Sequence, residues 1–342
     1  MINIEKPVVV VTMGDPCGIG PEVIAKALSE GHIQNHCRPI VLGNTEALKE
    51  AVTVSDLEIS VCEISNVENY INSDNVISII DPNNIEFKDV TPGYLSPACG
   101  KASMEWVELA ANLIMSGKAH ALATAPINKE AAKSGGYKSI GHMELLQELS
   151  SAKNVATMLV TGTLNVVHLT THHSLRIACD YVTKERVLSM IQLTHESFQE
   201  WGMPRPRIGT AALNPHAGDG GLLGKEEYES ILPAIKQARL TGIDVYGPVP
   251  ADIIFHQAIG GKYDVVLAMY HDQGHIAIKV HGFEESISVN LGLPFVRTSV
   301  DHGTAFDIAG KGIANHISMT KAINLAANMY RGTFSFGKEN LS

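Results

Sequence analysis

Short apolar runs of strand length recur along this chain, and longer amphipathic stretches separate them. In 263–270, YDVVLAMY, Val265, Val266 and Leu267 follow one another without a polar residue between them. A strand buried on both faces of a parallel sheet is continuously apolar in this way. Runs of the same kind predict strands at 8–13, 39–43, 76–81, 121–126, 155–162, 165–171, 207–215 and 263–270. Strands that alternate with helices predict an α/β fold with a largely parallel sheet.

The stretches between these runs carry helix signals. Pro21 stands in the first turn of one expected helix and Gly31 at its end, which is the usual asymmetry of helix termini. Val187, Ile191 and Phe198 recur at helical spacing in another stretch and predict one buried face. We expect helices at 21–31, 183–202, 224–242 and 318–332. No repeat or Pro/Gly-rich linker marks a domain boundary in the 342 residues, so two interleaved domains are expected.

Composition and charge exclude several classes of protein. The net charge is −10 and no run of Lys and Arg stands out, so neither nucleic acid nor an anionic membrane is an expected partner. The five cysteines are scattered without a CxxC pair, which fits a reduced cytoplasmic protein. The N-terminus lacks the features of a signal peptide, and no apolar stretch approaches the ~18 residues of a membrane span.

Three histidines follow expected strands in the same way. His172 closes LNVVHLTTH, His216 closes RIGTAALNPH and His271 closes DVVLAMYH. Three imidazoles at one edge of a sheet, with a fourth position open, are typical of a catalytic divalent metal. Any one of them alone is more often a hydrogen-bonded structural histidine, but the shared context favours a metal site. Structural or supporting roles are expected for the neighbouring His168, His173 and His275.

Basic groups follow the third of these histidines. Lys279 ends HIAIK, and Arg297 comes after LGLPFV. Arg offers a planar fork that matches carboxylate or phosphate, and Lys is a point charge for the same anions. Each alone could be a solvated cation, but their position after a polar cluster favours an anionic substrate. His142 in GHMELL, at an expected helix start, could contact the same anion or could cap the helix.

Two glycine-rich segments stand near the ends of the chain. VVVVTMGDPCGIGPEV follows a strand and opens a helix, but its glycines form neither the dinucleotide fingerprint nor a P-loop. SVDHGTAFDIAGKGIANH packs Gly303, Gly310 and Gly312 around Asp307 and Asn315. Glycines there would let the backbone approach a ligand closely, although a structural loop has the same composition.

The same two segments carry a resemblance to known enzymes. GDPCGIGPEV is similar to a motif near the start of isocitrate and isopropylmalate dehydrogenases, and HGTAFDIAGKGIANH resembles their NAD-binding loop. The whole chain more closely resembles the 4-hydroxythreonine-4-phosphate dehydrogenase family. The motifs that carry this resemblance run from residue 14 to about 315, and are GDPCGIGPE, ATAPINKEA, GHMELL, TTHHSLR, NPHAGDGGLLGKEE, YGPVPAD, AMYHDQGHIAIK and LGLPFVRTSVDHGTAFDIA.

The resemblance implies the isopropylmalate-dehydrogenase-like fold, with two α/β domains and a cleft between them. One expected domain takes 1–128 and 298–342, and the other takes 129–297. The resemblance also implies a homodimer whose active site is shared by both subunits, with one divalent metal ion on His172, His216 and His271. All-His ligation favours a transition metal such as Zn, with Mn, Co or Mg as alternatives.

The implied reaction is oxidation of a secondary alcohol by NAD or NADP, followed by loss of a carboxylate as carbon dioxide. Implied substrate contacts come from His142, Lys279 and Arg297. The general base is left open among Asp252, Asp272 and Lys279. The nucleotide would be bound partly by a loop whose candidate residues are His302, Gly303, Ala305, Asp307, Gly310 and Asn315.

Two departures from the family pattern bear on the substrate. The family usually has Thr where this chain has Met143, and Asn where it has Ser288, and both positions touch substrate in the family. Other phrases are closer to the branch that oxidises 4-phospho-D-threonate or 4-phospho-D-erythronate to dihydroxyacetone phosphate. We therefore expect a phospho-aldonate substrate, with 4-phosphohydroxy-L-threonine of vitamin B6 synthesis as the alternative. A further relative acts on an aromatic dihydrodiol and lacks the Arg present here as Arg297.

Two other classes of function compete with a dehydrogenase. A trihistidine metallohydrolase would leave the glycine-rich loop at 302–315 without a purpose. A non-catalytic sugar-phosphate binding protein would have no need of His172, His216 and His271 together. Both are therefore less favoured than a decarboxylating dehydrogenase.

Overall fold

The structure is a computed structural model that describes residues 6–139 and 141–333. The chain divides into two compact units. The first unit runs as far as Lys153 and resumes at Leu293–Arg331, and the second unit contains Asn154–Gly292. The chain thus leaves the first unit once and returns to it, so that strands from both ends of the sequence enter one sheet.

The sheet of the first unit is parallel throughout. Its strands are β1 (Val8–Thr12), β2 (Arg38–Leu42), β3 (Ser60–Glu63), β4 (Val76–Ile80), β5 (Ala121–Thr124) and β12 (Val296–Val300). Their order is β3–β4–β2–β1–β5–β12. Val9, Val10 and Val11 are fully buried. Consecutive β-branched residues suit a central strand that helices cover on both faces.

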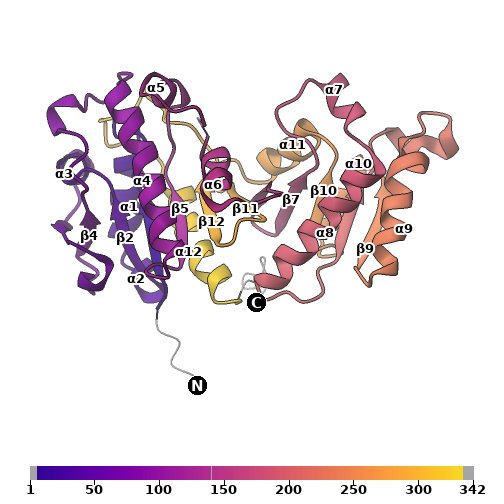
Figure 1. Cartoon of the computed structure of the whole chain (residues 1–342), viewed down its shortest axis with the longest axis horizontal. Helices are drawn as coiled ribbons and strands as arrows, with labels where there is room; N and C mark the ends of the chain where they lie inside the picture. The colour runs from indigo at the N-terminus through magenta and orange to yellow at the C-terminus, as the bar shows by residue number, and fades with distance from the viewer. Residues whose placement is uncertain (1–5, 140, 334–342) are drawn as a thin grey trace. The chain divides into compact units, whose positions relative to one another are not determined.

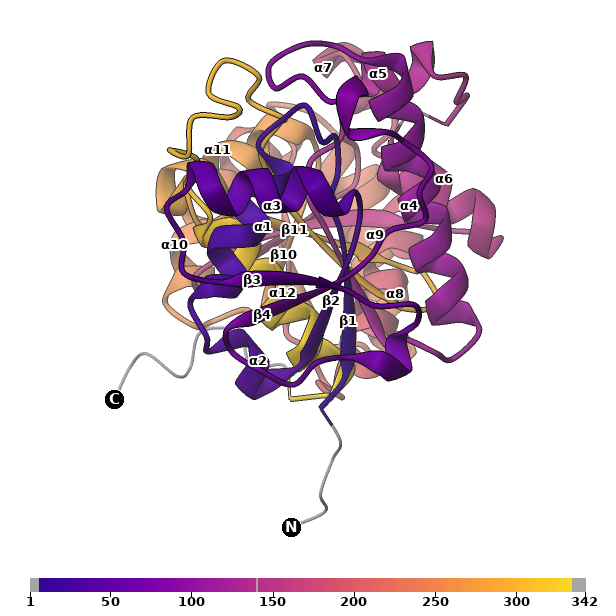
Figure 2. The same ribbon diagram turned by 90° about the vertical axis from the view of Figure 1, so that its left-hand side faces the viewer.

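Helices cover both faces of this sheet. They are α1 (Gly20–Ser29), α2 (Ile33–His36), α3 (Thr45–Val54), α4 (Pro97–Met115), α5 (Lys129–Ser134), α6 (His142–Ser150) and α12 (Ile317–Tyr330), with short 3-10 turns η1 (Val67–Asn69) and η2 (Phe87–Asp89). Helices α1 and α12 pack together on one face, and α4 lies on the other (Figure 2). Helices α5 and α6 pack on α4, which is why 129–153 belongs to the first unit rather than to the second.

The second unit has a mixed sheet. Its strands are β6 (Ala156–Thr161), β7 (Leu164–His168), β8 (Ile208–Ala211), β9 (Val245–Val249), β10 (Val265–Ala268) and β11 (Ile287–Leu291). The order is β11–β6–β7–β10–β8–β9. Strand β6 is antiparallel to both of its neighbours, whereas β7, β10, β8 and β9 are parallel to one another. The carboxyl ends of β7, β10 and β8 therefore meet at one edge of the sheet.

In the described part of the chain, five α-helices accompany this sheet. The helices are α7 (Leu175–Asp180), α8 (Lys184–Glu200), α9 (Leu232–Leu240), α10 (Ala251–Ile259) and α11 (His271–Gly282), with the turns η3 (Pro215–Gly221) and η4 (Glu227–Ile231). Helices α10 and α11 pack on β7 and β10, while α8 packs on α9 (Figure 1). Leu164, Val166, Val266, Ile254 and Ile278 belong to the buried cluster beneath α10 and α11.

All eight strands expected from apolar runs are present, and four further strands lacked that signal. Strand β3 is half-exposed and β9 contains Gly247 and Pro248. Strand β11 alternates apolar with polar residues, and β12 has three polar residues in succession between two valines. Arg297, Thr298 and Ser299 of β12 are nevertheless buried. Periodicity fails there because the polar groups of β12 bond inside the first unit. Within the described ranges, no helix is both long and apolar enough to cross a membrane.

Candidate active site

The three predicted metal-binding histidines are positioned by three adjacent strands. His172 follows β7, His271 opens α11 after β10, and His216 lies in η3 after β8. Strand β10 lies between β7 and β8, and all three run in the same direction. The topology therefore delivers the three imidazoles to the same edge of the second unit's sheet, as polar groups at the carboxyl ends of parallel strands are expected to be.

His172 and His271 face a common cavity. Their ring centroids are 5.8 Å apart. The cavity has a volume of about 290 Å³ and is lined by Thr171, His172, His173, Leu175, Ala178, Tyr270, His271 and Asp272. Asp272 Oδ1 lies 2.7 Å from His271 Nδ1, which fixes the orientation of the ring and leaves Nε2 for a ligand. A carboxylate behind an imidazole is a common arrangement in metal sites, so these residues fit a divalent ion.

His216 lies in a loop with an unusual backbone. His216, Ala217 and Asp219 have φ values of 53°, 56° and 42°, in the left-handed region that non-glycine residues rarely adopt. The buried carboxylate of Glu227 holds the start of this loop, because it accepts a hydrogen bond from the Asn214 backbone N–H at 2.8 Å. Strain that the surroundings maintain in this way is typical of functional sites. Sequence reasoning did not single out Glu227.

One chain does not close the three histidines into a ligand set. Among the residues that the structure describes, the ring nitrogens of His172, His216 and His271 do not all lie within 4.8 Å of one another. His216 is exposed and is absent from the lining of the cavity that His172 and His271 share. The fold thus brings the three residues to one sheet edge, and two of them to one cavity.

A stack of histidines supports His271. The His275 ring lies against it with centroids 3.5 Å apart, and His275 Nδ1 lies 3.1 Å from His168 Nε2. Burial, together with the neighbouring His275 and His271, lowers the pKa of His168 to about 3. His168 is therefore neutral at physiological pH. These contacts match the supporting roles expected for His168 and His275.

Asp272 also borders a second cavity. This cavity, of about 580 Å³, lies along α10 and α11 and is lined by Ala251, Asp252, Phe255, His256, Ile259, Tyr270, Asp272, Gln273, Ile276, Ala277, Val280 and His281. Two of the three candidates for the general base, Asp252 and Asp272, therefore face one space. Only Asp272 also borders the cavity that His172 and His271 share.

Lys279 lies two turns further along α11 than His271. Eight residues of α-helix correspond to about 12 Å along the axis. Lys279 Nζ donates to Ser286 Oγ at 2.9 Å, immediately before β11. Residues two apart in an extended chain share a face, so Ser286 and Ser288 point the same way. The structure thus gives Lys279 a partner, Ser286, which the sequence did not indicate, and places Ser288 two residues beyond that partner in β11.

The first unit contains a buried cation beside a buried imidazole. Arg297 is 5% exposed, and its Nη2 donates to Thr124 Oγ1 at 2.6 Å. Burial lowers the pKa of Arg297 to about 9, opposed by the nearby Glu144 carboxylate, so the guanidinium stays protonated at neutral pH. Burial, followed by repulsion from Arg297, lowers the pKa of His142 well below its ordinary value. Met143 is half-buried next to it at the start of α6.

The surroundings of His142 and Arg297 are suited to binding an anion. Its Nε2 is buried and has no hydrogen-bond partner within the described ranges. A neutral imidazole can donate from one nitrogen. A neutral donor beside a buried guanidinium is a suitable environment for a carboxylate or phosphate oxygen. Thr124 and Glu144 belong to this group through their effects on Arg297, and neither was identified from the sequence.

The predicted nucleotide loop is anchored at its start and in its middle. At its start, His302 Nε2 lies 3.1 Å from Ser318 Oγ. In its middle, the Gly310 backbone N–H donates to Glu22 Oε1 at 2.6 Å. Ala305 has a φ of 43°. Asp307 and Asn315 are exposed. Asn315 Oδ1 also accepts a hydrogen bond from the Ile317 backbone N–H at 2.9 Å.

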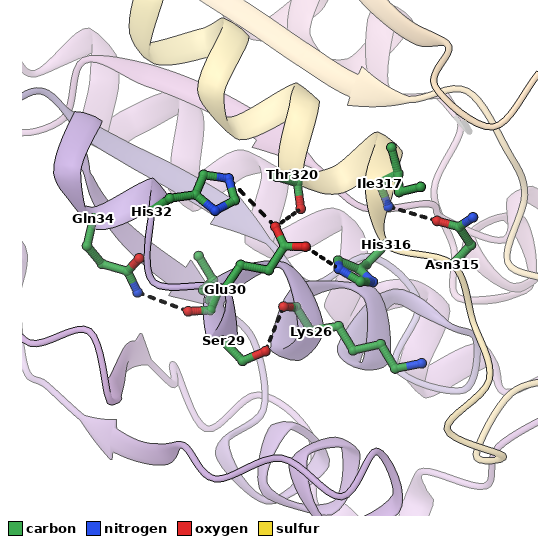
Figure 3. A network of polar contacts seen from close by, with 10 residues as sticks. Lys26, Ser29, Glu30, His32, Gln34, Asn315, His316, Ile317 and Thr320 are labelled. Atoms are coloured by element: carbon green, nitrogen blue, oxygen red, sulfur yellow. Dashed lines mark hydrogen bonds and ion pairs between the residues drawn. The ribbon is translucent and has the colours of Figure 1, made fainter. Parts of the chain in front are cut away.

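Residues of helix α1 and of its C-terminal cap bind the C-terminal part of the loop (Figure 3). Lys26 Nζ donates to Gly312 O at 2.7 Å and to Ala314 O at 2.9 Å. Glu30 lies between α1 and the loop, with Oε1 2.7 Å from His316 Nε2. Thr320 Oγ1 donates to the other oxygen of Glu30 at 3.2 Å. These contacts hold 312–316 in place and leave the exposed side of the loop available for a ligand.

A cavity of about 240 Å³ borders the same loop. It is lined by Pro16, Gly18, Pro21, Glu22, Ala47, Glu50, Ala51, Val54, Phe87, Val90, Pro92 and Gly310. The two glycine-rich segments of the sequence therefore meet in one place, since Gly18 belongs to the first and Gly310 to the second. Its walls are mostly apolar, which suits a planar ring.

Comparison with known proteins follows the same lines. Residues 35–326 match the family model described as "Pyridoxal phosphate biosynthetic protein PdxA". A protein from Fusobacterium nucleatum subsp. nucleatum, provisionally named a D-threonate 4-phosphate dehydrogenase, is 43% identical over 319 residues, or 93% of this chain and 96% of the relative. A match of this extent confirms the resemblance that the sequence motifs indicated.

Solved structures agree with the sequence comparison. A 4-hydroxythreonine-4-phosphate dehydrogenase from Klebsiella pneumoniae is 39% identical with a TM-score of 0.89, over 95% of this chain and 98% of that one. The enzyme of that name from Burkholderia phymatum is 41% identical with a TM-score of 0.85, over the same shares. The expected fold is confirmed, as is the expectation of an oxidoreductase that acts on a CH–OH group. This chain belongs to the PdxA family.

Proposed function

We propose that this protein is a metal- and NAD(P)-dependent decarboxylating dehydrogenase of a 4-phosphorylated 3-hydroxy acid. The preferred substrate is 4-phospho-D-threonate or 4-phospho-D-erythronate, and the products are dihydroxyacetone phosphate and carbon dioxide. The observation that carries the proposal is the pair His172 and His271 facing one cavity, with Asp272 orienting His271. The name of the Fusobacterium relative supports the same substrate class.

The atoms of this reaction balance without a further reactant. The C3 hydroxyl loses its proton to a base and carbon C3 transfers its hydride to the cofactor, which leaves a 3-keto acid. The C1–C2 bond then breaks, C1 departs as carbon dioxide, and C2 takes up a proton. When bound, a divalent ion on His172, His216 and His271 polarises the oxygen at C3, and the nicotinamide ring accepts the hydride.

The protein's own cations hold the two anionic ends of the substrate. Arg297 is charged, buried and fixed by Thr124, so that it can form a bidentate contact with little loss of side-chain entropy. His142 adds a neutral donor beside it. Lys279 is held by Ser286 and supplies a point charge for the other end. Which cation takes the carboxylate and which takes the phosphate is left open.

Asp272 is the best placed of the three candidate bases. It borders both cavities of the second unit and contacts His271, so it would be the nearest of the three to a hydroxyl polarised by a metal on His271. Asp252 borders only the larger cavity, and Lys279 is two helical turns away. We infer that Asp272 both orients His271 and receives the proton, directly or through water.

A second copy of the chain is proposed to complete the site. The three imidazoles are not closed into one ligand set by the described part of a single chain. Helix α11 and the residue that follows it expose Ile276, Val280 and Phe283, which are 61%, 84% and 72% accessible. Exposed apolar residues gathered in this way mark an interaction surface. A homodimer through this surface would bury them and supply the missing ligand.

The first prediction concerns the metal. His271→Ala should abolish turnover and weaken divalent metal binding by at least about tenfold, because two imidazoles make a poor site. His195→Ala, on α8, should retain both. Kinetics after chelation, with elemental analysis of the purified protein, measure this. Full activity in a strong chelator, with no divalent ion bound, would contradict the metal dependence.

The second prediction concerns the nucleotide loop. Lys26→Met removes two charge-assisted hydrogen bonds that hold 312–314, and should raise the KM for the nicotinamide cofactor by about tenfold with a smaller effect on kcat. Lys49→Met, which removes an exposed ion pair with Glu46, is the control and should leave both constants unchanged. An unchanged cofactor KM in Lys26→Met would refute the role of the loop.

The third prediction concerns the dimer. Val280→Asp places a charge on the apolar surface and should shift the protein towards monomers at micromolar concentration, with loss of turnover. Leu240→Asp, at an 88% exposed position on α9, should remain dimeric and active. Sedimentation of both variants at several concentrations gives the answer. A fully active monomer would rule out a shared site.

The fourth prediction concerns substrate choice. Met143 and Ser288 replace two polar contacts of the vitamin B6 enzymes, and a site that has lost a partner for the 2-amino group loses its preference for it. The wild type should have a higher kcat/KM for a phospho-aldonate than for 4-phosphohydroxy-L-threonine. Met143→Thr should bring the kcat/KM values for these two substrates closer together. The alternative substrate is supported by the names of the solved relatives, and a wild-type preference for it would reverse our assignment.

A further inference from the structure

A cluster of three potential metal ligands lies in the first unit, apart from the residues assigned above. Asp15 and Cys17 belong to the loop after β1, and Cys99 lies in the first turn of α4. All three are fully buried. One carboxylate oxygen and the two sulfur atoms lie within 4.8 Å of one another. The pair of thiols is close, with 3.3 Å between the Sγ atoms.

The hydrogen bonds of the cluster leave one oxygen over. Asp15 Oδ1 accepts from the Cys17 backbone N–H at 2.9 Å. Cys17 Sγ donates to Cys99 Sγ, and Cys99 Sγ lies 3.5 Å from the Asp89 backbone oxygen. Asp15 Oδ2 is buried and has no partner among residues 6–139 and 141–333. A buried polar atom without a partner is costly and indicates that a ligand is missing.

We propose that Asp15, Cys17 and Cys99 bind a thiophilic divalent cation of the zinc class. Two sulfurs and one carboxylate oxygen are a soft donor set that selects Zn²⁺ over Mg²⁺ or Ca²⁺. Binding releases the two thiol protons, and the carboxylate oxygen without a partner supplies the third ligand. A protein-bound water would occupy the fourth position.

The spacing of the sulfurs favours a metal over a disulfide. Two thiolates on a tetrahedral zinc ion lie about 3.8 Å apart, since each Zn–S bond is about 2.3 Å. The present 3.3 Å would have to open by about half an ångström. A disulfide would require the same atoms to close to about 2.05 Å, which is a larger movement in a packed interior.

The local charge also favours anionic ligands. Cys99 lies in the first turn of α4, a helix of 19 residues, and α1 begins three residues after Cys17. The amino ends of helices carry partial positive charge and stabilise thiolates. Contact with Cys99 lowers the pKa of Cys17, whereas the same contact, followed by burial, raises the pKa of Cys99. Burial raises the pKa of Asp15 to about 6, which leaves the carboxyl ionised at neutral pH.

An ion here would act as a structural clamp. The loop that carries Cys17 supports the proposed nucleotide segment, because the Ile19 backbone N–H donates to Thr304 O at 3.0 Å. A Cβ added to Gly18 would come within 2.8 Å of Thr304, so the packing is close. The cation would tie this loop to α4 and thereby fix the floor beneath Thr304. This role is independent of the histidine site.

Cobalt substitution distinguishes the two proposed sites. Co²⁺ on thiolates gives an intense near-ultraviolet charge-transfer band, which Co²⁺ on imidazoles lacks. Metal-free full-length protein, reduced and titrated with Co²⁺, should develop this band to the intensity of one thiolate-bound equivalent per chain, in addition to any Co²⁺ bound at the histidines. His172→Ala/His271→Ala should keep the band, so that failure of the histidine site does not affect this result. Cys17→Ser/Cys99→Ser should lose it, while Cys62→Ser should keep it.

A second variant tests the carboxylate without removing the sulfurs. Asp15→Asn should keep the band but weaken Co²⁺ binding by at least about tenfold, and the rise in melting temperature that Zn²⁺ gives to the wild type should shrink accordingly. Absence of a thiolate band in wild-type protein with excess Co²⁺ would overturn the proposal. A Cys17–Cys99 disulfide in protein purified without reductant, re-forming after reduction in the presence of Zn²⁺, would overturn it as well.

Discussion

The parallel alignment of β7, β10 and β8 is the constraint on which the proposed chemistry depends. Three adjacent strands that run in one direction must end at one edge, so residues that follow them are gathered without any local signal. His172, His271 and His216 are distant in sequence and reach one edge of the sheet for this reason, and two of them, His172 and His271, share a cavity. The antiparallel β6 leaves this arrangement intact because it pairs on the far side of β7. The direction of the strands therefore brings the three histidines to one edge, and the segments after the strands supply the side chains.

Burial then sets the charge states of Arg297 and His142, the two groups of the first unit that are proposed to contact the substrate. Arg297 is a cation on a strand that the first unit covers, and its charge survives because Thr124 and Glu144 offset part of the desolvation. Burial keeps His142 neutral, and the same burial makes the charge of Arg297 energetically costly. An anionic substrate would relieve both conditions at once. An acidic protein can bind such a substrate only by concentrating its few cations in this way.

The two glycine-rich segments act as one structure. Helix α1 starts in the first segment and holds the second through Lys26 and Glu30, while Gly18 packs on Thr304. Glycine is required where the backbones approach so closely. The proposed cation at Asp15, Cys17 and Cys99 would reinforce the same region from below. The proposed nucleotide segment and the packing of the first unit are thus linked through one loop.

The sequence alone determined much of this protein. Continuous apolar runs predicted eight strands, because burial on both faces of a sheet leaves no room for polar side chains. Short motifs identified the family, because eight of them occur along this chain in one order. The sequence could not predict β12, whose polar residues are satisfied by groups such as Thr124 that are distant along the chain. Nor could it predict the pairing of Lys279 with Ser286, the support of His271 by His275, or the contact of Cys17 with Cys99. Those contacts depend on tertiary structure, because hydrogen bonding and desolvation are decided by what surrounds a residue in space and not by its neighbours in sequence.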